Sequence, residues 1–223
     1  MYSIDNDIFN FLKELKNNNN REWFNSNKVR YLQIRESIKG FSNSIKDELN
    51  KFDQIDNVKI FRIYRDIRFS KDKTPYKKNF GIAFHRKKPK LRGGYYIHIE
   101  ENKTFIACGF WNPNKDDLNR IRKEFQIDSK EFRDIINNKN FKKVWGDLKG
   151  EELVSSPIGF SKDDPNIDLI KKKMYLFSIN FTNSDILKNN FSNKITSSFK
   201  NISPFFNYMS YVLTTDLNGE SII

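Results

Sequence analysis

The stretch GYYIHIEENKTFIACGFW, residues 94–111, decides the fold class. Two short runs rich in aromatic and β-branched residues, 94–100 and 104–111, flank the compact polar link ENK. Runs of this kind bounded by turn residues are typical of strands, and a short polar link joins them into a β-hairpin. The sequence therefore predicts an antiparallel pair of strands near the middle of the chain.

Similar segments on both sides extend this hairpin into a sheet, and helical periodicity surrounds the sheet. The arrangement predicts an α+β single domain over residues 1–223, with an N-terminal helix pair, a central largely antiparallel sheet and C-terminal helices. The other expected strands are 59–66, 80–86 and 174–181, and the main expected helices are 6–17, 21–51, 114–126, 129–145 and 184–201.

The composition suits a folded protein without a membrane-spanning segment. The chain has 223 residues, of which 37% are hydrophobic and 15% aromatic, so a sizeable core is expected. The longest apolar runs are too short to span a bilayer, and the first 20 residues lack the apolar segment of a signal peptide. We expect a cytoplasmic protein with no membrane partner, and the single cysteine, Cys108, cannot form an internal disulfide.

The net charge of +12 is concentrated in one segment. Residues 59–92 hold thirteen Lys or Arg and two Asp, whereas the rest of the chain holds 27 basic and 26 acidic residues. A general bias towards lysine would spread the excess along the chain. The concentration therefore indicates a local site for an anion.

Three arginines within this segment sharpen the prediction. Arg62, Arg65 and Arg68 recur at three-residue spacing, and guanidinium groups do not lose their protons to relieve repulsion. The two nearby acids are too few to neutralise this segment unless a remote acid joins them, so a bound anion is expected. Trp111 could stack on a planar ligand. The candidate ligand-binding residues are Arg62, Arg65, Asp66, Arg68, Lys73, Tyr76, Lys77 and Trp111.

A second candidate group lies on the expected strand 94–100. Tyr96, His98 and Glu100 alternate along the strand and share one face. His98 and Glu100 suit a general acid/base pair or two metal ligands, with a hydrogen-bonded structural histidine as the alternative. The chain has two histidines, so a histidine-rich metal site is excluded and no metal is assigned. The catalytic candidates are His98, Glu100 and Asp66, and no motif names a cofactor.

Several motifs together resemble a known family. FRIYRDIRFSKDKTPYKKNFG (61–81), NNNREWFNSNK (18–28), GYYIHIE, GFWNP and IGFSKDDPNIDLIKKK occur in the order seen in a family of bacterial proteins, also found in some fungi, known as a domain of unknown function. The resemblance covers about residues 8–210 and implies one complete domain. It supplies no activity, substrate or cofactor, and the lysine-rich stretch 86–92 departs from it. The hallmark positions that it carries over are Arg62, Arg65, Asp66, Arg68, Phe69, Lys73 and Tyr76.

Three functions fit these observations. The first is a pocket for a small phosphorylated or carboxylated molecule, with or without catalysis. The second is a nucleic-acid-binding module that uses the basic segment 59–92. The third is a structural network in which the arginines pair with acids and no ligand is bound. The sequence assigns neither a reaction nor an oligomeric state.

Overall fold

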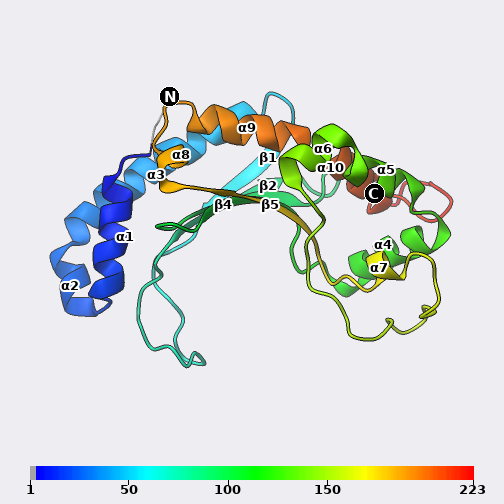
Figure 1. The fold of residues 1–223 in the computed structure, drawn as a ribbon, viewed down its shortest axis with the longest axis horizontal. Helices are drawn as coiled ribbons and strands as arrows, with labels where there is room; N and C mark the ends of the chain where they lie inside the picture. The colour runs from blue at the N-terminus through cyan, green and yellow to red at the C-terminus, as the bar shows by residue number, and fades with distance from the viewer. Residues whose placement is uncertain (1–3) are drawn as a thin grey trace. The chain divides into compact units, whose positions relative to one another are not determined.

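The predicted hairpin is formed by β3 (Gly94–Ile99) and β4 (Thr104–Phe110), whose turn contains Asn102 with a φ of 59°. A computed structural model describes residues 4–223, and these form ten helices and a five-stranded antiparallel sheet (Figure 1). The strands lie in the order β1-β2-β3-β4-β5, which follows their order in the chain. The α+β fold class is confirmed. The remaining strands are β1 (Ile55–Ile60), β2 (Phe80–Arg86) and β5 (Tyr175–Phe181).

The helices precede and follow the main block of strands, as expected. No helix within residues 4–223 combines the length and the apolar character needed to cross a membrane. The helices are α1 (Asp7–Asn17), α2 (Arg21–Ser26), α3 (Lys28–Leu49), α4 (Lys115–Ile127), α5 (Lys130–Asn137), α6 (Lys139–Trp145), α7 (Ile167–Ile170), α8 (Asn183–Ile186), α9 (Phe191–Asn201) and α10 (Ser203–Val212).

Two predicted helices are each broken by an asparagine. The helix expected over 21–51 divides into α2 and α3 at Asn27, whose side chain donates to the Trp23 carbonyl at 2.9 Å. The helix expected over 129–145 divides into α5 and α6 at Asn138, whose side chain caps α6 by accepting from the Phe141 N–H. Asparagine can end a helix because its side-chain amide competes with the backbone hydrogen bonds. The apolar residues on both sides keep their helical spacing, so the pattern alone does not show the break. Similarly, the helix expected over 184–201 is α8 and α9, which are separate.

The described chain divides into two units. That residues 1–223 form one domain stays a prediction, and each unit is described by itself. The first unit contains the described residues up to Phe84 together with Tyr96–Ile106 and Asn180–Ser197, and the second contains His85–Tyr95, Ala107–Ile179 and Ser198–Ile223.

In the first unit, helices cover one face of the sheet. Figure 1 shows α3 and the start of α9 on the same side of the strands, and the rings of Phe41 and Phe191 lie 6.4 Å apart between these helices. The core of this layer includes Ile38 and Ile45 of α3, which are fully buried. A loop of residues 61–79 extends from the other side of the sheet (Figure 1). This loop carries most of the candidate residues.

The prediction of a strand over 59–66 is wrong, because the strand in this region, β1, covers residues 55–60. β1 ends at Ile60, and after the Phe61 N–H has donated to the Gly81 carbonyl the chain leaves the sheet. The β-branched and aromatic residues Ile63 and Tyr64 suggested a strand, but they pair with the returning arm of the loop instead of the sheet. Ile63 is buried, as predicted, whereas Phe61 is partly exposed.

Candidate functional site

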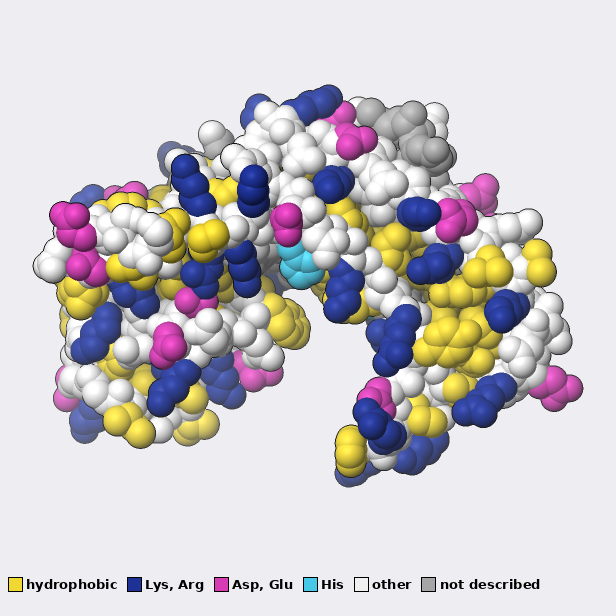
Figure 2. All heavy atoms as spheres, turned by 180° about the vertical axis from the view of Figure 1, so that it is seen from behind, with side chains coloured by type: hydrophobic (Ala, Val, Ile, Leu, Met, Phe, Trp, Pro, Cys, Tyr) yellow, Lys and Arg dark blue, Asp and Glu magenta, His cyan; other side chains and the backbone are white. Residues whose placement is uncertain are grey.

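The two arms of the loop 61–79 pair with each other. The Arg65 N–H donates to the Pro75 carbonyl at 2.9 Å, and the Lys77 N–H donates to the Ile63 carbonyl at 2.7 Å. This pairing satisfies backbone groups that the sheet does not reach. The basic side chains therefore project from a defined backbone. Figure 2 shows Lys and Arg side chains gathered over the end of this loop, at the lower edge of the view, with few acidic side chains among them.

Tyr76 anchors the loop to the N-terminal helices. The Asn19 side chain donates to the Tyr76 carbonyl and accepts from the Tyr76 N–H, both at 3.0 Å. The Tyr76 ring is 3% exposed and stacks on Phe24 at 4.0 Å between ring centroids, and an isolated bridge joins Tyr76 to Tyr64. Burial raises the pKa of the Tyr76 hydroxyl. The backbone and the ring of this predicted ligand residue are thus used in packing.

Arg65 is neutralised inside the loop. Its guanidinium lies 2.5 Å from the Asp72 carboxylate and donates to the Thr74 hydroxyl at 2.5 Å and to the Ser70 hydroxyl at 3.2 Å. Hydrogen bonds from the backbone and side chain of Thr74, and then from Arg65, lower the pKa of Asp72 to about 2. These contacts fix the tip of the loop.

Arg68 is paired with the other acid of the loop. Its guanidinium donates to both oxygens of Asp66, at 3.0 and 2.7 Å, and these hydrogen bonds lower the pKa of the Asp66 carboxyl. The Lys73 ammonium donates to the Ile67 carbonyl at 3.1 Å. Arg65 and Arg68 therefore pair with different acids, and the structural alternative describes these two arginines well.

Among the cations of this region that have no acidic partner in the described chain, three are linked by their positions around Phe61 and by their charges. Lys59, Arg62 and Lys77 form no ion pair with an acidic side chain among residues 4–223, and we call them the Phe61 cation cluster. The Lys59 and Lys77 ammonium groups lie 5.0 and 5.6 Å from the centroid of the Phe61 ring. Burial, and then the charges of Arg62 and Lys59, lower the pKa of Lys77. The charge of Arg62 also acts on Asp66, which is already paired with Arg68.

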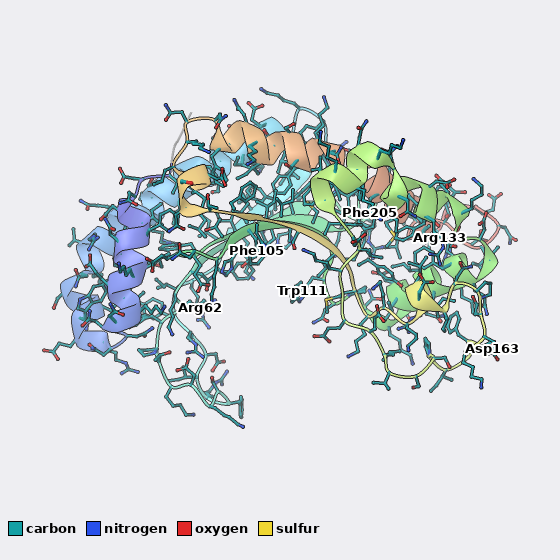
Figure 3. All side chains as sticks on the ribbon, in the orientation of Figure 1. Arg62, Phe105, Trp111, Arg133, Asp163 and Phe205 are labelled. Atoms are coloured by element: carbon teal, nitrogen blue, oxygen red, sulfur yellow. The ribbon has the colours of Figure 1, made fainter. Side chains whose placement is uncertain are left out.

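Beside this cluster, the three residues of the GYYIHIE strand form a hydrogen-bonded chain. His98 Nε2 lies 2.9 Å from Glu100 Oε2, and His98 Nδ1 lies 3.4 Å from Tyr96 Oη and 3.4 Å from Asn79 Nδ2. The imidazole stacks on Phe105 of β4 at 4.7 Å with an interplanar angle of 12°. Figure 3 shows Phe105 on the side of the sheet from which the loop extends, and Arg62 where the loop begins.

Gly81 lies where the hydrogen-bonded chain of Tyr96, His98 and Glu100 meets the Phe61 cation cluster. A Cβ atom on Gly81 would lie 2.6 Å from Tyr96 Oη and 3.2 Å from Phe61 Cδ2. The rings of Phe61 and Tyr96 meet edge to face, with centroids 6.3 Å apart. Only a residue without a side chain lets the tyrosine hydroxyl lie this close to the backbone of β2.

Two hollows open next to these groups in the first unit. One has a volume of about 380 Å³ and is lined by His98, Glu100, Phe105 and Asn180, among others. The other is lined by Arg21 of α2 and by Tyr64, Arg65 and Pro75 of the loop. The His98–Glu100 pair is therefore accessible from one side, while Tyr96 lies on the side of the Phe61 cation cluster.

The last candidate, Trp111, lies at the end of β4 in the second unit and is 72% exposed. Within residues 4–223, no three His, Cys, Asp or Glu side chains are grouped closely enough to hold a metal ion.

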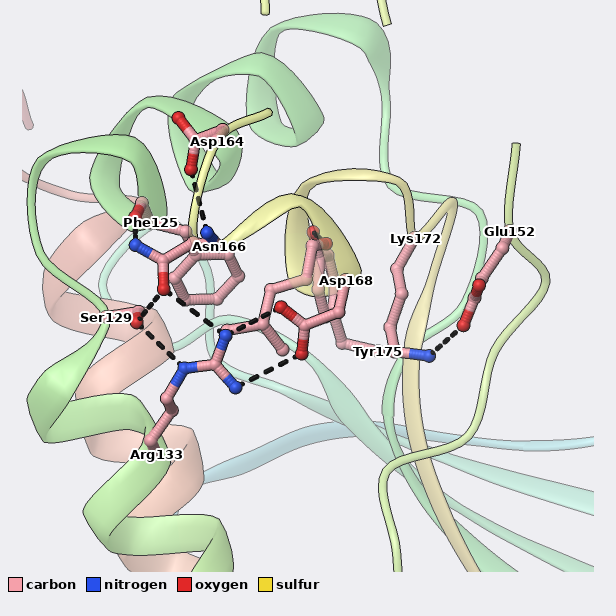
Figure 4. A network of polar contacts seen from close by, with 10 residues as sticks. Phe125, Ser129, Arg133, Glu152, Asp164, Asn166, Asp168, Lys172 and Tyr175 are labelled. Atoms are coloured by element: carbon pink, nitrogen blue, oxygen red, sulfur yellow. Dashed lines mark hydrogen bonds and ion pairs between the residues drawn. The ribbon is translucent and has the colours of Figure 1, made fainter. Parts of the chain in front are cut away.

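A second polar network, in the second unit, is structural (Figure 4). Arg133 of α5 donates to both oxygens of Asp168 in α7, at 3.1 and 2.6 Å, and to the Ser129 hydroxyl at 3.0 Å. Asn166 donates to the Phe125 carbonyl at 2.8 Å and accepts from Ser129 at 2.5 Å. These bonds attach the IGFSKDDPNIDLIKKK segment to α4 and α5.

Sequence reasoning missed Asn19, Lys59 and Asn79. Asn19 is one of four consecutive asparagines, and nothing local distinguishes it from its neighbours. Lys59 lies in β1, outside the arginine block, although its spacing of two residues from Phe61 places both side chains on one face of an extended chain and was a usable signal. Asn79 is an uncharged residue among five lysines and arginines of the segment 71–86, and nothing in the sequence marks it as a partner of His98.

Comparison with known proteins gives one family. The family model described as "Conserved hypothetical protein (DUF2461)" matches residues 7–208. Neither the curated proteins nor the solved structures contain a match.

Proposed function

We propose that this chain, which belongs to the conserved hypothetical protein family DUF2461, binds a small phosphorylated or carboxylated molecule at the Phe61 cation cluster. The proposal narrows the predicted site from the whole arginine block to Lys59, Arg62 and Lys77. Arg65 and Arg68 then shape the loop that presents this cluster.

The carrying observation is that the acids of the loop are used elsewhere. Asp72 is paired with Arg65 and Asp66 with Arg68, so the cluster has no acid of its own. Two unit charges 4 Å apart repel by about 1–4 kcal/mol, depending on how well water screens them. Lys77 is partly buried, and its lowered pKa reflects both burial and this repulsion. A bound anion would remove the repulsion.

The chemistry of the cluster suits a small anion with an apolar body. Arg62 offers the forked donors that match phosphate and carboxylate oxygens, and the two lysines supply point charges. The centroid of the Phe61 ring lies 5.0 and 5.6 Å from the ammonium groups of Lys59 and Lys77, and the ring is partly exposed. We therefore expect phenyl phosphate and benzoate to bind more tightly than inorganic phosphate or acetate.

The test is ligand-induced stabilisation with those four compounds. A ligand present at one hundred times its Kd stabilises the folded state by about 2.7 kcal/mol, which raises the Tm of a chain of this size by roughly 5–10 °C. Lys77→Ala and Arg62→Ala should each weaken binding by about 10- to 150-fold, since a hydrogen bond to a charged group contributes about 1.5–3 kcal/mol.

Lys71→Ala is the matched control, because Lys71 is an exposed lysine of the same loop outside the cluster. Its affinity should match that of the unsubstituted chain. The proposal is wrong if none of the four compounds raises the Tm, or if Lys71→Ala weakens binding as much as Lys77→Ala does. Tight binding of an oligonucleotide that survives Lys77→Ala would favour the nucleic-acid alternative.

A further inference from the structure

The Tyr96–His98–Glu100 chain has a fixed direction of proton donation. A carboxylate accepts hydrogen bonds and does not donate them, so the 2.9 Å contact with Glu100 Oε2 places the imidazole proton on Nε2. The other nitrogen, Nδ1, is then an acceptor, and the Tyr96 hydroxyl and the Asn79 amide face it at 3.4 Å. His98 is thus oriented to accept a proton from Tyr96.

The Tyr96 side chain also lies beside Phe61, the ring at the centre of the proposed anion site. Its hydroxyl lies against Gly81, and the Tyr96 ring contacts the Phe61 ring that carries the cation cluster. Burial raises the pKa of Tyr96, so the phenol is protonated at rest. The Tyr96 hydroxyl therefore has a proton acceptor in His98, and the Tyr96 ring lies against the Phe61 ring, whose centroid is 5.0 and 5.6 Å from the ammonium groups of Lys59 and Lys77.

We propose that Tyr96 is a catalytic residue that takes a proton from an anionic ligand held by the Phe61 cation cluster, with His98 and Glu100 as positioning residues. The inference rests on the proposed function and adds a reaction class to it. The ligand would be a small phosphorylated or carboxylated molecule with an acidic C–H or O–H bond near its anionic group.

The step is balanced without a co-reactant. The ligand's proton passes to Tyr96 Oη while the phenol proton passes to His98 Nδ1, which leaves an imidazolium paired with Glu100. The electron pair of the broken bond stays on the ligand, where Lys59, Arg62 and Lys77 face the new negative charge. Return of the proton to the same atom gives exchange, and return to a neighbouring atom gives an isomer.

A covalent probe tests the activation of Tyr96 without knowledge of the natural ligand. 4-(Fluorosulfonyl)benzoate carries a carboxylate for the cluster and a sulfonyl fluoride for the phenol. Tyr96 Oη forms a bond to sulfur, fluoride leaves, and the phenol proton passes to His98. The tryptic peptide 93–103 contains both Tyr95 and Tyr96, and Tyr95 is 2% exposed, so it is an internal control.

We expect mass spectrometry to find the adduct on Tyr96 before any other of the nine tyrosines. The rate should fall at least tenfold in His98→Ala, and in Glu100→Gln, which keeps the size of the side chain but loses the charge. Tyr96→Phe should give no adduct in this peptide. The proposal is overturned if Tyr96 reacts no faster than the exposed Tyr211.

The pH dependence of the Tyr96 labelling rate shows whether His98 takes the phenol proton, a step that we call the relay, or has only a structural role. This measurement uses the unsubstituted chain and needs no variant to fold. The groups that face the imidazole are Glu100, Tyr96, Asn79 and the stacked Phe105. Assistance by the imidazole lets Tyr96 react below the alkaline range, whereas an unassisted phenol reacts only as pH approaches about 10 or above. A rate that rises only in the alkaline range overturns the relay.

The neutral reagent benzenesulfonyl fluoride distinguishes this inference from the proposed function. If it labels Tyr96 as fast as the carboxylate reagent does, the relay is supported and the anion site is wrong. If phosphate compounds stabilise the chain through Lys77 but neither reagent selects Tyr96, the anion site stands and the relay is overturned.

Discussion

Replacement of Asn19 by alanine should loosen the loop 61–79, although Asn19 lies outside the loop. Its side chain makes two hydrogen bonds to the backbone of Tyr76, both at 3.0 Å and both partly buried. The two groups of Tyr76 would lose their partner next to a ring that is 3% exposed and stacked on Phe24. The loss is therefore expected to exceed that of an exposed contact.

The magnitude follows from these two bonds. A typical hydrogen bond contributes about 0.5–1.5 kcal/mol to stability, so Asn19→Ala should lower the free energy of unfolding by about 2 kcal/mol. For a chain of this size the Tm should fall by roughly 4–8 °C. Asn18→Ala is the matched control, because Asn18 is exposed and its amide donates only to the Glu14 carbonyl within its own helix end. Its effect should stay within about 0.5 kcal/mol.

Urea denaturation measures the stability of both variants, and amide hydrogen exchange locates the change. In Asn19→Ala the N–H groups of Tyr76 and Lys77 should exchange faster, while that of Ile97 in the sheet core should be unchanged. Equal destabilisation by Asn18→Ala and Asn19→Ala, or unchanged exchange at Tyr76, would refute the reasoning. Either result would mean that the loop is held by its own pairing alone.

Three further outcomes are expected. Hydrogen bonds from Thr74 lower the pKa of Asp72 in the folded state to about 2, below the ordinary 3.8. The Asp72 carboxylate therefore contributes fully to stability above pH about 4, and this contribution is lost as the pH falls through about 2. The NMR shift of the Thr74 amide should follow this transition and should not do so in Asp72→Asn. Gly81→Ala should displace the Tyr96 hydroxyl and lower stability by about 1 kcal/mol in urea denaturation, and an unchanged rate of Tyr96 labelling would contradict the displacement. Arg133→Ala, which removes a two-bond pair with an exposed carboxylate, should lower stability by about 1–2 kcal/mol, and an unchanged Tm would show that the second polar network contributes little.

The sheet was predictable because strand geometry is local. Alternation and turn residues located β3 and β4 to within one residue of the expected bounds, and β2 and β5 were also found. The error at 59–66 arose because Ile63 and Tyr64 have strand-forming side chains that pair with residues 75–77 of the same loop. Propensity describes the conformation of a residue and does not name its pairing partner.

The asparagines show the same limit for the site. In the sequence the four residues 17–20 are identical, yet Asn20 caps α2 by accepting from the Trp23 N–H at 2.9 Å, and Asn19 bonds to Tyr76. The partners of Asn19 and Asn20 lie 57 and three positions away in the chain. Only the first depends on how the N-terminal helices meet the loop, and no local pattern could reveal it.

The sequence by itself determined the fold class, the hairpin and the segment that holds the excess charge, because backbone periodicity and composition are properties of neighbouring residues. The tertiary structure alone decided which cations are neutralised. It paired Arg65 with Asp72 and Arg68 with Asp66, and it left Lys59 and Lys77 next to the Phe61 ring without an acid. Charge compensation depends on separations of a few ångströms between particular side chains, and even for partners two or seven positions apart in the chain those separations are set only after folding.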